Sequence, residues 1–144
     1  MVAGLVNDTS TSAEAGAAEA ATSIDVSAAT VRRCDDGIIE ILIRDGATVG
    51  VREMEAILAA QLQLTQGPVA VLVDARPVKS MTREAQELIT GTASERKTRA
   101  VAILIDSPVS AFLGNFFLAL SRPVYPTKLF RRADAARQWL LTHL

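Results

Sequence analysis

The sequence has 144 residues, of which 49% are hydrophobic and 22% are charged, and its formal net charge is −1. This length accommodates one globular domain with a substantial core, and the weak charge argues against a nucleic-acid-binding protein. A single cysteine excludes an intramolecular disulfide, and no apolar run reaches the ~18 residues that a membrane span requires. Without a signal-peptide pattern at the N-terminus, we expect a cytoplasmic protein.

The first stretch, residues 1–26, is rich in Ala, Ser, Thr and Gly. Residues 1–25 carry four acidic side chains and no Lys or Arg. So few large apolar side chains cannot offset the entropy lost on ordering the chain. We therefore predict a disordered acidic tail at 1–26, either passive or acting as a tether or autoinhibitory arm, followed by one domain at 27–144.

The remainder alternates apolar runs with amphipathic stretches. A hairpin comes first, with strands at 28–34 and 38–43 and Gly37 supplying a positive φ in the turn. Helices and strands then alternate: helix 51–62, strand 69–73, helix 82–94, strand 100–105, helix 107–120, strand 127–130 and helix 131–144. Strands that are apolar at every position and linked by helices are typical of parallel sheets. The predicted fold is α/β, a mixed and mainly parallel sheet of about five strands flanked by about four helices, in the order β-β-α-β-α-β-α-β-α.

The periodicity of the first two helices predicts which sides face the core. In the first helix the apolar residues at helical spacing are Val51, Met54, Leu58 and Leu62. In the second helix the residues predicted to face the core are Ala85, Leu88, Ile89 and Thr92, and Thr82 is a plausible N-cap.

This succession, with Val71-Leu72-Val73-Asp74 followed by Val78, resembles the STAS domain of anti-sigma-factor antagonists and sulfate transporters. The ending, with Phe130, Ala136 and Trp139-Leu140, is similar to the STAS-like branch that shares features with lipid-cradling SEC14-type domains. The resemblance covers about residues 28–144 and suggests an uncharacterised bacterial branch. It implies a regulatory docking module that performs no chemistry.

Antagonists of that family carry a phosphorylatable serine in an Asp-Ser-Ser-Gly run at the start of the helix after this turn. The matching positions here hold Thr82, Arg83, Glu84 and Ala85, so Arg83 or Glu84 replaces the serine. Ser80 and Thr82 are nearby hydroxyls that could accept phosphate, although neither matches the serine position. The alternative is that Thr82 only caps the helix and Ser80 is an ordinary turn hydroxyl.

The strands ending at Asp74 and at Ile105 should reach the same edge of the sheet, where partner and ligand sites of such folds lie. Mixed charges and hydroxyls gather there, and the candidate partner-binding residues are Asp74, Arg76, Lys79, Ser80, Thr82, Arg83, Asp106, Ser107 and Ser110. The alternative is that Asp74 and Ser107 cap turns while the other side chains are merely solvated.

The helix predicted at 107–120 is the most apolar of the chain. Its candidate residues for an apolar ligand or a protein interface are Phe112, Leu113, Phe116, Phe117 and Leu118. The alternative is that these residues are core or singly exposed apolar side chains.

No catalytic or metal constellation can be assembled. Cys34 has no basic neighbour in sequence, and His143 has no evident nucleophile and orienting acid. We therefore predict a non-enzymatic protein without a cofactor, which docks a protein partner of unknown identity or a second copy of itself. The alternative is a small apolar-ligand or lipid carrier that uses a cradle beside helix 109–120.

Overall fold

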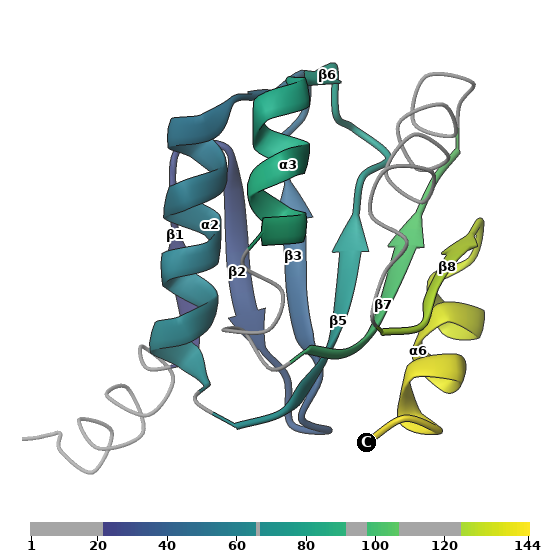
Figure 1. Ribbon diagram of the computed structural model, residues 1–144. Helices are drawn as coiled ribbons and strands as arrows, with labels where there is room; N and C mark the ends of the chain where they lie inside the picture. The colour runs from purple at the N-terminus through teal and green to yellow at the C-terminus, as the bar shows by residue number, and fades with distance from the viewer. Residues whose placement is uncertain (1–21, 66, 92–97, 107–124) are drawn as a thin grey trace, which may run out of the picture.

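The computed structural model describes residues 22–65, 67–91, 98–106 and 125–144. A central sheet carries helices on both faces, and a second, two-stranded sheet lies at one end of it (Figure 1). The elements in chain order are β1 (Ser23–Asp25), β2 (Ala29–Arg33), β3 (Ile39–Ile43), β4 (Thr48–Val49), α2 (Val51–Leu64), β5 (Val69–Asp74), β6 (Ser80–Met81), α3 (Arg83–Gly91), β7 (Thr98–Leu104), β8 (Thr127–Phe130) and α6 (Ala133–Leu141). None of the helices described in these ranges has the length and apolarity to cross a membrane.

The central sheet has six strands in the order β1-β2-β3-β5-β7-β8. Strands β1, β2 and β3 pair antiparallel, whereas β3, β5, β7 and β8 pair parallel. This confirms the predicted mixed, mainly parallel α/β sheet. Three helices are described, and the further helix predicted at 107–120 lies outside the described residues.

The predicted boundary of the tail, at residue 26, lies inside the sheet, because Ser23–Asp25 form β1 along β2. Ile24 packs against the core, the Asp25 carboxylate accepts a hydrogen bond from the Thr30 hydroxyl at 2.6 Å, and Arg44 lies 3.6 Å from the same carboxylate. A strand of three residues with one core-facing side chain has almost no periodic signal. Its order comes from pairing with the neighbouring β2 and from Arg44, contacts that the composition of these three residues does not show.

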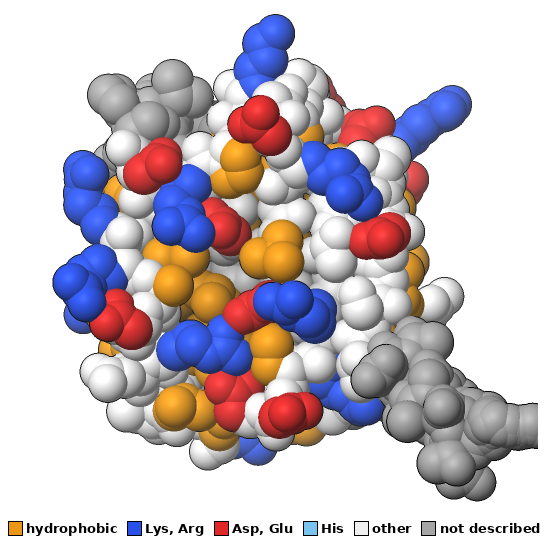
Figure 2. Space-filling model, turned by 180° about the vertical axis from the view of Figure 1, so that it is seen from behind, with side chains coloured by type: hydrophobic (Ala, Val, Ile, Leu, Met, Phe, Trp, Pro, Cys, Tyr) orange, Lys and Arg blue, Asp and Glu red, His pale blue; other side chains and the backbone are white. Residues whose placement is uncertain are grey.

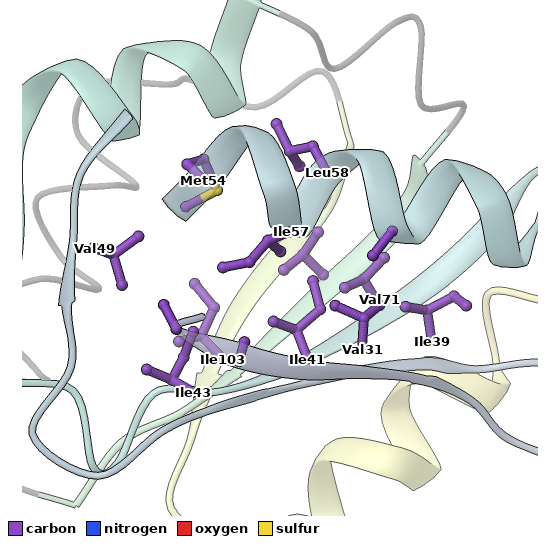
Figure 3. Close-up of a cluster of buried hydrophobic side chains, with 14 of the residues drawn as sticks. Val31, Ile39, Ile41, Ile43, Val49, Met54, Ile57, Leu58, Val71 and Ile103 are labelled. Carbon is purple, nitrogen blue, oxygen red and sulfur yellow. The ribbon is translucent and has the colours of Figure 1, made fainter. Parts of the chain in front are cut away.

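The two faces of the sheet bury separate sets of side chains. Alternate residues of each strand face opposite sides, so Val71 packs in the core beneath α2 and α3, whereas Leu72 packs against α6. Helices α2 and α3 cover one face and α6 covers the other (Figure 1). Figure 3 shows Ile57 of α2 pointing toward Ile41 of the sheet.

The prediction of which residues of α2 face the core was only half right. Met54 and Leu58 are buried, but Val51 and Leu62 are exposed. The buried side of the helix instead includes Ile57, Ala60, Gln61 and Leu64, which share the spacing of a single helical face. The apolar pattern predicted the wrong buried face because one position at the centre of the true buried face holds a polar residue, Gln61.

Candidate functional site

The edge where β5 and β7 end is built around an ion pair. The Asp74 carboxylate accepts hydrogen bonds from Arg76 Nε at 2.9 Å, from Arg76 Nη2 at 2.7 Å and from the Arg76 backbone N–H at 3.2 Å. The Ala75 N–H donates to Leu104 O at 3.1 Å, which joins the end of β5 to the end of β7. Arg76 is thereby fixed at the sheet edge with 40% of its side chain exposed.

The charged groups at this edge stabilise one another's ionised forms. Hydrogen bonds from the Arg76 side chain hold the pKa of Asp74 below its ordinary value, in spite of the partial burial of that carboxyl. The same contacts raise the pKa of Arg76, and the charge of Asp106 adds to this effect. The structure thus places Asp74, Arg76 and Asp106 in one electrostatic group, as the sequence predicts.

A small parallel sheet immobilises the segment that follows, residues 75–82, which we call the edge loop. Strand β6 pairs with β4, Lys79 N–H donates to Ala47 O at 2.9 Å, and Gly46 N–H donates to Pro77 O at 2.8 Å. The Ser80 hydroxyl lies 3.3 Å from the Thr48 hydroxyl. The backbone of the edge loop is therefore fixed, while the side chains of Arg76, Lys79 and Ser80 stay exposed.

Thr82 begins α3 as the sequence predicts. Its hydroxyl oxygen accepts the Ala85 N–H at 3.1 Å, and its own N–H donates to Val49 O at 2.9 Å. This side-chain bond satisfies one of the unpaired amides of a helix N-terminus. Arg83 is exposed and lies 3.5 Å from Glu87 on the next turn of the same helix.

The other predicted site residues lie outside the described residues. These are Ser107 and Ser110 of the partner-binding set, and Phe112, Leu113, Phe116, Phe117 and Leu118 of the apolar set. Their roles stay predictions.

The sequence analysis missed a cavity of about 100 Å³ between α2, α3 and the sheet. The described residues in its walls are apolar side chains, together with Gln61 of α2 and Tyr125. Underneath the edge loop, Ala75, Val78 and Met81 line the same space. A polar residue in the middle of the buried face of α2 is the signal in the sequence that could have indicated this feature.

The opposite side of the sheet carries an ion network. Glu40 of β3 binds both Arg32 and Arg137, and Arg137 Nη2 also binds Asp36 at 3.0 Å. Burial lowers the pKa of Arg137, but hydrogen bonds to Cys34, Asp36 and Glu40 outweigh that effect and raise it above its ordinary value. Figure 2 shows acidic and basic side chains interspersed over this face rather than gathered by sign.

Residues 33–144 match the model of a family described as "Domain of unknown function (DUF7793)". No curated protein matches the chain. A crystal structure of an uncharacterized protein from the DUF3478 family with a SpoIIAA-like fold, from Shewanella loihica PV-4, is 14% identical. It covers 81% of this chain and 98% of its own, with a TM-score of 0.57. The anti-sigma factor antagonist SpoIIAA in its unphosphorylated form is 15% identical, covers 78% of this chain and 97% of its own, and has a TM-score of 0.52. These likenesses confirm the STAS-like fold.

Proposed function

Because this chain belongs to the DUF7793 family and has a SpoIIAA-like fold, we propose that it is a non-catalytic regulatory module that docks a protein partner. The docking surface is the edge formed by Asp74, Arg76, Lys79, Ser80 and Asp106 together with the start of α3. The solved relative named as an anti-sigma factor antagonist is a protein that acts on another protein, which supports a protein partner here.

One observation carries the proposal, namely that hydrogen bonds hold the backbone of the edge loop while the side chains of Arg76, Lys79 and Ser80 are exposed. Strand β6, the Lys79–Ala47 and Gly46–Pro77 bonds and the Asp74–Arg76 pair fix the loop. A binding surface that is ordered before the partner arrives loses little conformational entropy on association. Loops held by a rigid scaffold are where binding residues gather. The edge loop has both properties.

The exposed charges suggest what the partner offers. Arg76 is paired with Asp74 and Arg83 lies 3.5 Å from Glu87, and Lys79 and Arg83 are the exposed basic side chains between Arg76 and the first turn of α3. We therefore infer that the partner places an acidic segment along Lys79 and Arg83. Complementary charges of this kind mainly accelerate association and fix its register.

Ser80 and Thr82 lie near the position that is phosphorylated in STAS antagonists, and Ser80 is the better candidate to receive a phosphate group. Thr82 already accepts the Ala85 N–H, whereas the Ser80 side chain is exposed on the edge loop. A phosphate on Ser80 would place negative charge between Lys79 and the docking partner, and would oppose an acidic segment.

The experiment is affinity capture with the full chain as bait in extract of its own host, followed by quantitative mass spectrometry. The variants are Arg76→Glu and Asp106→Lys at the edge, with Arg33→Glu as the matched control. Arg33 lies at the other end of the sheet, where Arg33 Nη1 donates one hydrogen bond to Leu64 O at 3.2 Å. Circular dichroism checks that each variant is folded.

A protein captured by the wild type and by Arg33→Glu, and lost with both edge variants, supports docking at this edge. Equal capture by all four folded baits places the partner elsewhere and contradicts the proposal. Hydrogen exchange on the purified complex then tests whether the edge loop is the contact, because protection should concentrate at residues 75–82.

A further inference from the structure

Gln61 of α2 lines the cavity and is only 1% exposed. Within the part of the chain that the structure describes, neither its Nε2 nor its Oε1 has a hydrogen-bond partner. An unpaired buried amide costs stability, because it has lost its bonds to water and gained none in return. A leucine or methionine at this position would fill the same space without that cost. The carboxamide therefore requires an explanation that packing alone does not give.

Ordered water explains the amide poorly. A buried water needs two to four polar partners. Apart from Gln61 and Tyr125, the described side chains that line the cavity are Ile, Leu, Val, Ala and Met. A water at Gln61 would lose most of its hydrogen bonds against such walls. The walls instead match the body of an apolar molecule.

We propose that this cavity binds a small neutral molecule with an apolar body and one carboxamide or unionised carboxylic acid group, which pairs with Gln61. Such a group offers a donor and an acceptor side by side. The Gln61 Nε2–H donates to the ligand carbonyl, and the ligand N–H or O–H donates to Gln61 Oε1. One molecule thus satisfies both atoms that the fold leaves unpaired.

The size and the charge of the ligand follow from the cavity. An engineered apolar cavity of about 150 Å³ binds benzene, so a space of about 100 Å³ suits a short aliphatic chain rather than a lipid tail. No charged residue is among the described residues that line it. An ionised carboxylate would be costly to bury there, so the bound form is neutral.

This site differs from the apolar cradle predicted at Phe112–Leu118. It lies between α2, α3 and the sheet, and its specificity comes from a residue of α2 that the sequence analysis did not single out. The inference goes beyond docking and does not rest on it, because none of the exposed edge residues takes part.

The test uses the full chain, with butyramide as the probe and xenon as a small apolar comparison. Titrations are followed by ¹H–¹⁵N NMR, which reports directly on the side-chain NH₂ of Gln61. The variants are Gln61→Met, which keeps the length of the side chain and removes the amide, and Gln63→Met as the control. Gln63 lies on the same helix but is exposed.

Butyramide should bind the wild type and Gln63→Met saturably, and shift the Gln61 NH₂ resonances. Two hydrogen bonds of about 1 kcal/mol each correspond to an affinity about tenfold to thirtyfold weaker in Gln61→Met. Xenon should bind all three proteins within about threefold of one another, which shows that the Gln61→Met cavity is intact.

Equal butyramide affinity in wild type and Gln61→Met would overturn the role of Gln61. Absence of saturable binding to the wild type would overturn the site. So would a crystal structure of the wild type soaked in butyramide that shows only water bonded to both Gln61 atoms.

Discussion

Arg137 of α6 binds the buried carboxylate of Glu40 on β3, across 97 positions of sequence. The same carboxylate binds Arg32 of the neighbouring strand, and Arg137 reaches on to Asp36 in the hairpin turn. One carboxylate therefore joins the last helix to the first hairpin of the sheet. A charge buried in this way is stable only while its partners remain.

We predict that Glu40→Gln destabilises the fold by about 1–3 kcal/mol. Breaking a fully buried pair costs about 3–5 kcal/mol, and the cost is smaller here because 27% of the Arg137 side chain and 49% of the Arg32 side chain are exposed. Urea unfolding measures the difference. Asp134→Asn, which removes the exposed Arg132–Asp134 pair, is the control and should leave the midpoint unchanged.

Removing the cap of α3 should weaken that helix first. We predict that Thr82→Ala costs about 1 kcal/mol, because the Ala85 N–H loses its acceptor. Thr82→Ser keeps a hydroxyl in place and should recover most of the stability. Hydrogen exchange at the Ala85 amide provides a local measurement, and unchanged protection in Thr82→Ala would show that the cap contributes nothing.

Replacing the glycine in the turn before β4 should lower the stability of the fold. Gly46 has φ of 72°, a region that costs other residues about 1–2 kcal/mol. A methyl group added at Gly46 or at Gly67 would meet no heavy atom within 4 Å, so Gly46→Ala tests the backbone alone. We predict that Gly46→Ala lowers the melting temperature, whereas the control Gly67→Ala, where φ is outside this region, does not. Equal effects would contradict this account of the turn.

The Asp74–Arg76 pair should make stability depend on pH in acid. The folded pKa of Asp74 is lowered, so the unfolded chain takes up the proton first as pH falls. The contribution of the pair is present above the unfolded pKa of about 3.9 and is lost as pH drops through the lower folded value. We predict that Arg76→Gln is less stable than the wild type by up to about 1 kcal/mol at pH 7. The two proteins should converge at the most acidic pH, and a constant difference would assign the effect of Arg76 to packing.

The parts of the fold that the sequence predicts well are those whose signal is local. Strands β5 and β7 are apolar at nearly every position because both faces are covered, and the hairpin turn has its positive φ at Gly37 as expected. Thr82 caps α3 because an N-cap needs only a hydroxyl three residues before the amide it accepts.

The parts that the sequence did not predict are strands too short to show a period. Strands β4 and β6 have two residues each and exist only because they pair across 32 positions. No window over which strand periodicity is judged contains both of these strands, so pattern alone cannot reveal them. Strand β1 pairs with the neighbouring β2 and lies near Arg44, but its three residues are too few to show an alternation.

The residues of the candidate site also differ in how far the sequence alone identifies them. Asp74 and Arg76 could be grouped from the sequence because they are two residues apart at the end of a strand, and Asp106 because neighbouring parallel strands end together. For Gln61 the sequence offers only one signal, a polar residue on the buried face of α2, and the structure is needed to show that its amide has no hydrogen-bond partner among the described residues.

The edge loop has two sides, since Arg76, Lys79 and Ser80 are exposed while Ala75, Val78 and Met81 line the cavity. A molecule in the cavity and a partner on the edge would therefore contact opposite sides of one short segment. Thermodynamic reciprocity requires that any factor by which the molecule changes the affinity for the partner is the factor by which the partner changes the affinity for the molecule. If filling the cavity changes the affinity for the partner, the edge loop is the described segment that contacts both, and no covalent modification of the chain is needed.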